Sequence, residues 1–83
     1  MNARIKKKIH KITDLCFDVK DLGHDCYLRY FSHVKSFGLD IHKNGWDGEK
    51  EVDIHIDLYL DKTDTETKLD EMITCLETLI EES

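Results

Sequence analysis

Residues 52–60 alternate between apolar and polar side chains without a break, and this pattern constrains the fold more than any other feature of the chain. The apolar positions are Val52, Ile54, Ile56, Leu58 and Leu60, and the polar positions are Asp53, His55, Asp57 and Tyr59. Because successive side chains leave a strand on opposite faces, such a strand has one buried and one solvated face. We therefore expect a sheet that is covered on one side only, and its polar face is the first candidate for a binding surface.

Two amphipathic helices flank the predicted sheet. From Ile5 onward the apolar residues are spaced by three and four, which predicts a helix over residues 3–22 that ends at Gly23. A capping box runs from Thr63 to Glu66, so a second helix is predicted to begin there and to continue to about residue 81. Its apolar stripe has the same helical spacing.

The segment between the helices is rich in aromatic and branched side chains and lacks helical periodicity, which favours strands. We predict strands over residues 26–31, 35–43 and 51–61, with a hairpin loop at residues 44–48. The 83 residues then form a single α+β domain, of a size that supports one simple core. The predicted architecture is a two-layer sandwich in the order helix, three-stranded antiparallel meander, helix, with both helices on one face of the sheet.

The net charge of −6 conceals a division between the two halves of the chain. Residues 1–39 hold eight Lys or Arg and four Asp, a net charge of +4, whereas residues 40–83 hold four Lys and fourteen Asp or Glu, a net charge of −10. An acidic surface repels phosphate backbones and attracts basic surfaces, so we expect no direct binding of nucleic acid by the C-terminal half. The alternative is that these carboxylates only keep a small protein soluble.

Composition also restricts the compartment and the cofactors. Cys16, Cys26 and Cys75 are odd in number and far apart in the sequence, which favours free, reduced thiols over a metal or redox centre. No apolar run approaches the ~20 residues of a membrane span, and the N-terminus lacks the apolar segment of a signal peptide. We expect a cytoplasmic protein with no cofactor and no contact with a membrane.

The polar face of the sheet offers one arrangement of metal-ligating side chains. The candidates for a metal or small-ligand site are Asp40, His42, Asp53 and His55. They come together across two strands if Ile41 lies opposite Ile54, whereas a slip of two residues would set two of the carboxylates against each other. Zinc sites use such ligands, but exposed His and Asp pairs on a sheet usually only neutralise each other.

A protein-binding surface is our main interpretation of the acidic half. A tryptophan in the predicted loop either folds onto the edge of the core or anchors a partner. Carboxylates along a rigid strand and loop imitate the phosphates of a nucleic acid. The predicted contact residues are Trp46, Asp47, Glu49, Glu51, Asp53, Asp57 and Tyr59. Strand 51–61 and the helix over residues 3–22 also offer surfaces for a homodimer.

The predicted order of elements resembles two families of RNA-handling proteins. It is similar to the double-stranded-RNA-binding domain, whose second helix begins with lysines placed on phosphates, but the matching turn here, residues 61–66, is acidic. It also resembles the small messenger-RNA-cleaving toxins of the HicA type, whose Gly-Ser-His motif corresponds to Phe31-Ser32-His33. That resemblance implies a ribonuclease that uses His33. A lone histidine near a turn is more often structural, so we expect a non-catalytic protein.

A third resemblance is to small proteins encoded by phages and prophages of Gram-positive bacteria. It rests on Tyr30-Phe31-Ser32-His33-Val34, Gly45-Trp46 and Leu58-Tyr59-Leu60-Asp61. Among such proteins, compact acidic anti-CRISPR inhibitors place strands between helices and present carboxylates to the nucleic-acid channel of a host nuclease. The resemblance implies an inhibitor of a bacterial defence or DNA-processing protein, whose partner is a host protein with a basic nucleic-acid-binding surface.

Overall fold

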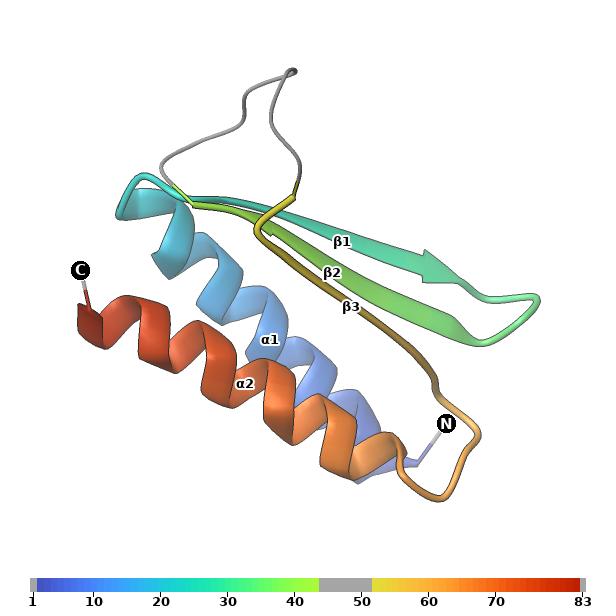
Figure 1. Ribbon diagram of the computed structural model, residues 1–83. Helices are drawn as coiled ribbons and strands as arrows, with labels where there is room; N and C mark the ends of the chain where they lie inside the picture. The colour runs from blue at the N-terminus through green and yellow to red at the C-terminus, as the bar shows by residue number, and fades with distance from the viewer. Residues whose placement is uncertain (1, 44–51, 83) are drawn as a thin grey trace.

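The computed structural model describes residues 2–43 and 52–82, and its elements follow the predicted order (Figure 1). They are α1 (Ala3–Asp21), β1 (Asp25–Phe31), β2 (Ser36–His42), β3 (Ile54–Tyr59) and α2 (Thr65–Glu82). The three strands form one antiparallel sheet in the order β1-β2-β3, and both helices lie on the same face of it (Figure 1). The predicted α+β sandwich is therefore confirmed.

The sheet adopts one of the two registers that its apolar pattern allows. Ile41 of β2 lies opposite Ile54 of β3, and Asp40 lies opposite His55. β1 pairs with β2 in the same phase, so the apolar residues of the three strands share one face, with the exception of Phe31. A shift by a single residue would turn the apolar side chains of a strand to solvent, so the alternation excludes it, but the alternation does not distinguish the observed register from a slip of two residues.

One apolar core fills the space between the sheet and the helices. The central strand supplies three buried side chains, Phe37, Leu39 and Ile41. The other buried apolar residues come from the helices and from the chain around the end of β3: Ile12, Val19, Leu58, Leu60, Leu69, Met72, Leu76 and Leu79. Burying an aliphatic or aromatic side chain of this size contributes about 1.5–3 kcal/mol. This shared core therefore positions the helices and the strands relative to one another.

The two helices run in the same direction, as the positions of their ends in Figure 1 show. Arg4 Nε lies 3.0 Å from Glu66 Oε1, and Lys8 Nζ lies 2.5 Å from Asp70 Oδ1. A step of four residues along α1 is thus matched by a step of four along α2. The C-terminal ends of both helices consequently lie at one end of the molecule, where their two negative dipole ends come together.

Local contacts explain where α1 begins and ends. The side chain of Asn2 accepts a hydrogen bond from the Ile5 amide at 2.9 Å and caps the N-terminus of the helix. Gly23 ends the helix as predicted, because its φ of 96° lies in the left-handed region that favours glycine. The Gly23 amide donates to the Lys20 carbonyl at 3.0 Å and so satisfies one of the last helical acceptors.

The prediction of a capping box at the start of α2 was wrong, because the helix begins at Thr65. The Lys68 amide donates to the Asp64 carbonyl at 3.0 Å, so Asp64 rather than Thr63 precedes the first turn. Thr65 is buried, and its hydroxyl donates to the Tyr59 carbonyl at 2.7 Å. This bond ties the helix to the end of β3, and the longer-range contact outweighs the local capping motif.

β2 and β3 are shorter at their ends than the sequence predicts, whereas β1 begins one residue earlier, at Asp25. β3 ends at Tyr59. The Leu60 amide, just after β3, donates to the carbonyl of Lys35, just before β2, at 2.8 Å. The hairpin loop predicted at residues 44–48 lies outside the described residues.

Neither described helix is both long enough and apolar enough to cross a membrane.

Candidate functional site

The face of the sheet turned away from the helices is uncovered by any other described element, as the alternation of residues 52–60 predicts (Figure 1). We call this surface the open face. It is formed by residues at alternate positions of the three strands: Asp25, Tyr27, Arg29, Phe31, Ser36, Gly38, Asp40, His42, His55, Asp57 and Tyr59. The face therefore combines charged residues at its centre with aromatic rings at its sides.

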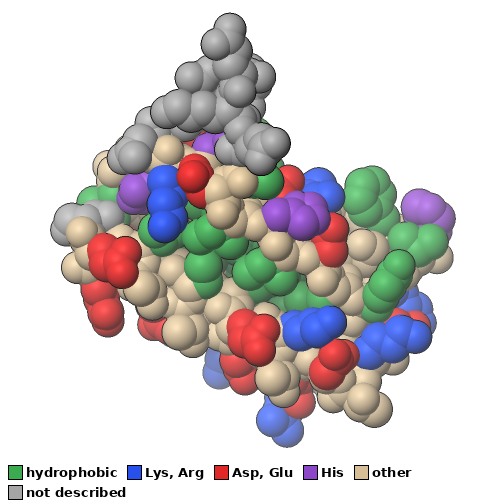
Figure 2. All heavy atoms as spheres, viewed as in Figure 1, with side chains coloured by type: hydrophobic (Ala, Val, Ile, Leu, Met, Phe, Trp, Pro, Cys, Tyr) green, Lys and Arg blue, Asp and Glu red, His purple; other side chains and the backbone are tan. Residues whose placement is uncertain are grey.

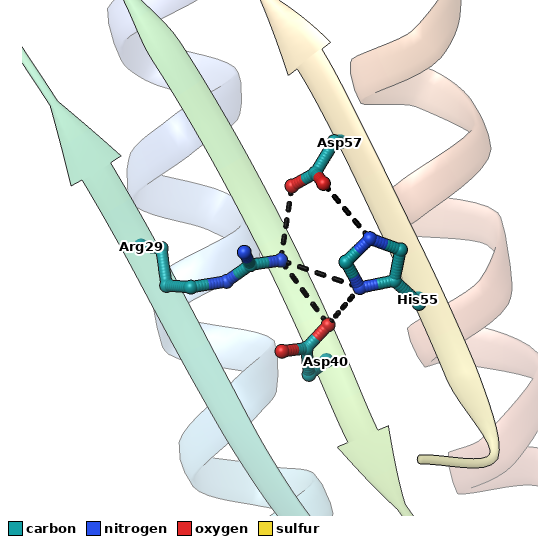
Figure 3. Close-up of polar contacts among 4 residues, drawn as sticks. All are labelled: Arg29, Asp40, His55 and Asp57. Carbon is teal, nitrogen blue, oxygen red and sulfur yellow. Dashed lines mark hydrogen bonds and ion pairs between the residues drawn. The ribbon is translucent and has the colours of Figure 1, made fainter. Parts of the chain in front are cut away.

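Four of these side chains meet at the centre of the open face (Figure 3). Arg29 of β1 reaches across β2, and its Nη2 lies 2.9 Å from Asp57 Oδ1 on β3 and 3.2 Å from Asp40 Oδ1 on β2. His55 lies between the same two carboxylates, with Nε2 2.8 Å from Asp57 Oδ2 and Nδ1 against Asp40 Oδ1. We call Arg29, Asp40, His55 and Asp57 the four-residue network. It joins all three strands through side chains as well as through the backbone.

Gly38 leaves the space that this crossing requires. It lies on β2 between its two strand partners, Arg29 on β1 and Asp57 on β3. A Cβ atom at position 38 would lie 2.7 Å from Arg29 Nη2 and even closer to the carboxylate of Asp57. The guanidinium therefore reaches Asp57 because the central strand carries no side chain at this point.

The surroundings of His55 decide what this histidine can do. The hydrogen bond to Asp40, and then the negative charge of Asp57, raise the pKa of His55 above its ordinary value of 6.5. With a proton on each nitrogen, the ring donates to one carboxylate on either side. A general base needs a nitrogen with a free lone pair. The network therefore favours a structural or binding role for His55 over proton transfer.

The four candidate metal ligands do not converge on one point, although the register that was to bring them together is correct. Two of them belong to the four-residue network. His42 instead meets Tyr27 edge-to-face, with ring centroids 5.6 Å apart, and Asp53 accepts a hydrogen bond from the Lys43 amide at 2.7 Å. Within the described part of the chain, no three His, Cys, Asp or Glu side chains are grouped as a metal site requires. Of the two candidate carboxylates, Asp40 is paired with Arg29 and Asp53 with the Lys43 amide instead.

The predicted partner-binding residues are divided between described and undescribed parts of the chain. Tyr59 is 55% exposed at the end of β3, Asp57 belongs to the four-residue network, and Asp53 lies just before β3. The other members lie outside the described residues: Trp46, Asp47, Glu49 and Glu51. Because the network pairs Asp57 with two basic side chains, the centre of the open face is less acidic than the sequence indicates.

Arg29 and Gly38 are the site residues that sequence reasoning missed. Neither belongs to a motif, and their relation to Asp57 appears only when three strands are aligned. One signal was present, because a glycine inside an otherwise apolar strand indicates that another group approaches the backbone closely. The sequence does not say which group this is.

Some of the described carboxylates without an ion pair lie near the C-terminal ends of the helices, whereas Asp14, Asp53, Asp61 and Glu71 lie elsewhere. Figure 2 shows acidic side chains at the end of the molecule where α2 terminates, with basic and acidic side chains interspersed towards the other end. We call this group the acidic end, and its members are Asp18, Asp21, Glu77, Glu81 and Glu82. All five are exposed, and none forms an ion pair with another described residue.

The remaining candidates from the sequence lie outside these two surfaces. His33 is exposed in the turn between β1 and β2.

All three cysteines are free, as expected. The thiols of Cys16 on α1 and Cys26 on β1 share a hydrogen bond, which raises the pKa of Cys16 and lowers the pKa of Cys26. These thiols therefore contribute to the packing of α1 on β1.

Comparisons with protein-family models, with curated proteins and with solved structures returned no match for this chain. The functional interpretation therefore depends on the open face and the acidic end themselves.

Replacing Gly38 with alanine should destabilise the native chain but stabilise an Arg29→Ala variant. In the native chain the new methyl group displaces the guanidinium from Asp57, which should cost about 1 kcal/mol. Without Arg29 the carboxylate of Asp57 is no longer held over position 38 and can turn away from the methyl group. The same change should then gain about 0.5–1 kcal/mol, because alanine loses less conformational freedom in a strand than glycine does. Urea unfolding of the native chain, the two single variants and the double variant measures these values. An effect of the same sign in both backgrounds would contradict the crossing over Gly38.

His55 should contribute more to the stability of the fold at mildly acidic and neutral pH than at alkaline pH. Because the pKa of His55 is raised in the folded state, its contribution is fully present below about pH 6.5, the unfolded-state value, and is lost as pH rises through the folded-state pKa. The destabilisation caused by His55→Ala should therefore be larger at about pH 6 than at about pH 9. An NMR titration should also show that Asp40→Asn lowers the pKa of His55. A pKa of 6.5 or less in the native chain would rule out this account.

Proposed function

We propose that the chain is a non-catalytic binding protein that docks its acidic end and its open face on a basic surface of another protein. Catalysis is not part of the proposal, because His55 faces a carboxylate with each ring nitrogen and His33 lies exposed in a turn, where a lone histidine is more often structural. The proposal also agrees with the distribution of charge in the sequence, whose C-terminal half is strongly acidic.

The acidic end is the observation that carries this proposal. The last turn of α2 contains no basic residue, and the one in α1, Lys20, is paired with Asp25 at 2.6 Å. Carboxylates at a helix C-terminus are unfavourable for the helix, because the negative end of its dipole lies there. Here two such ends lie together. Acidic residues that oppose helix stability are well explained by a contact with a cationic partner.

Rigid support makes these carboxylates effective for binding. Charges held on packed helices are already in place, so binding does not have to overcome the ordering entropy of a flexible acidic tail. A concentrated negative field also speeds the encounter with a basic partner. Proteins that bind nucleic acids present basic surfaces of this kind to phosphates. A host protein with a basic nucleic-acid-binding surface is therefore the proposed partner.

The open face supplies the part of the contact that does not depend on net charge. Tyr27, Phe31 and Tyr59 each expose a large part of their rings, and aromatic residues are enriched at the centres of protein interfaces. The predicted contacts in the undescribed segment, Trp46, Asp47, Glu49 and Glu51, remain part of this proposal.

This combination fits an inhibitor encoded by a phage or prophage, of the anti-CRISPR or anti-defence type. Its support is the resemblance noted for the sequence, the small size of the domain and the net charge of −6. In such an inhibitor the carboxylates take the place of phosphates in the basic channel of a bacterial defence or DNA-processing protein. The host protein then cannot bind its nucleic acid.

Charge reversal at the acidic end tests this function. The chain, immobilised and exposed to a bacterial lysate, should retain a nucleic-acid-binding protein that is released by added duplex DNA. Affinity for that protein should fall at least about tenfold, or about 1.4 kcal/mol, in the variant Glu81→Lys with Glu82→Lys, because two favourable charge contacts become repulsive.

The matched control carries Asp61→Lys with Asp64→Lys, which changes the net charge equally but lies before α2, at the other end of that helix. This control should bind as the native chain does. Equal losses in the two variants would show that only net charge matters. That result, or a captured complex that DNA cannot dissociate, would contradict the proposed function.

A further inference from the structure

β1 is an edge strand that carries few of the features that protect an edge from pairing. The sheet order β1-β2-β3 leaves its outer backbone groups without a neighbouring strand among the described residues. The strand contains no proline and no bulge, and the charge of Arg29 at its middle is drawn inward across β2. Edges of this kind are templates for an additional strand.

An apolar groove runs beside this edge, between β1 and α1. Its larger part has a volume of about 530 Å³ and is lined by Ile9, Leu28, Tyr30 and Phe37, with Lys6 and His10 at the rim. A second hollow continues the groove towards Cys16, Phe17 and Cys26. Thr13 and Leu28 line both parts, so they mark the middle of the groove.

Exposed aromatic side chains flank the same groove. Phe17 of α1 is 68% exposed, and Tyr30 of β1 is 55% exposed. Phe17 lies four residues after Thr13, and Ile9, in the larger hollow, lies four residues before it. A protruding ring and a hollow are thus placed at equal distances on either side of one central residue. A two-fold rotation about that centre exchanges them.

We propose that the occupant of this surface is a second copy of the chain, paired with the first along β1. A two-fold axis perpendicular to the sheet, passing beside Leu28 and Thr13, sets the two β1 strands antiparallel and keeps all four helices on one side. Leu28 then faces Leu28 of the second copy, Cys26 faces Tyr30, and Tyr27 faces Arg29. Phe17 of each copy enters the larger hollow of the other. The two sheets become one continuous sheet of six strands.

The charge on α1 is complementary to this arrangement. Before Thr13 the helix carries five basic residues and no acidic one: Arg4, Lys6, Lys7, Lys8 and Lys11. From residue 14 onward it carries three aspartates and a single lysine. The two-fold axis makes the two α1 helices antiparallel, so the basic half of each approaches the acidic half of the other.

The opposite edge of the sheet is unsuited to the same pairing. α2 packs against β3 and carries six acidic residues and one basic residue, so a dimer through β3 would bring two strongly acidic helices together. Joining β1 of one copy to β3 of the next would make parallel pairs and an open-ended chain of molecules rather than a closed dimer. Pairing through β1 also leaves the α2 part of the acidic end accessible, so this inference does not depend on the proposed function.

Sedimentation equilibrium of the full chain tests the dimer. Between about 10 µM and about 1 mM the measured mass should approach twice the 9.8 kDa of one chain. Phe17→Glu and Tyr30→Glu should each weaken dimerisation at least about tenfold, because the new carboxylate would be buried in an apolar groove. Circular dichroism checks that both variants are folded.

Tyr59→Glu is the matched control, because Tyr59 has the same 55% exposure as Tyr30 but lies on the other edge strand. It should dimerise as the native chain does. Amide hydrogen exchange in β1 should slow as the concentration rises, while exchange in β3 should not change. A monomer throughout the concentration range, assemblies larger than a dimer, or a dimer disrupted by Tyr59→Glu rather than by Tyr30→Glu would each overturn the inference.

Discussion

Burial of one face of a three-stranded sheet beneath two parallel helices is the constraint on which the rest of this structure depends. A domain of 83 residues supports only one core, so each strand must turn its apolar side chains to the same layer. The opposite face then receives the polar side chains of all three strands. The open face is thus a direct consequence of how the core is formed.

On that open face, the lack of a side chain at Gly38 determines how the charges are arranged. Arg29 passes over Gly38 and reaches Asp57 two strands away, so a basic residue from the N-terminal half compensates carboxylates of the acidic half. The acidic character of the protein is therefore expressed at the ends of the helices instead. Because α1 and α2 run parallel, their unpaired carboxylates and their negative dipole ends coincide there.

Local patterns predicted most of the fold. The alternation of residues 52–60 predicted β3 and its buried face, but it left the register open between the observed pairing of Ile41 with Ile54 and a slip of two residues. The start of α2 was misplaced because the hydroxyl of Thr65 bonds to the carbonyl of Tyr59, a contact between elements that no local motif records. The four-residue network was predicted only in its Asp40 and His55 pair. The part played by Arg29 was not predicted, because the position of its side chain depends on two neighbouring strands and on the space above Gly38.

The one-sided sheet is tested most directly by comparing two phenylalanines. Phe31 lies on the open face and is 49% exposed, whereas Phe37 lies on the covered face and is 3% exposed. Hydroxyl-radical footprinting of the folded chain, read by mass spectrometry, compares the oxidation rates of the two identical side chains. The account predicts rapid oxidation of Phe31 and protection of Phe37. Equal rates, or faster oxidation of Phe37, would contradict a sheet with one buried and one open face.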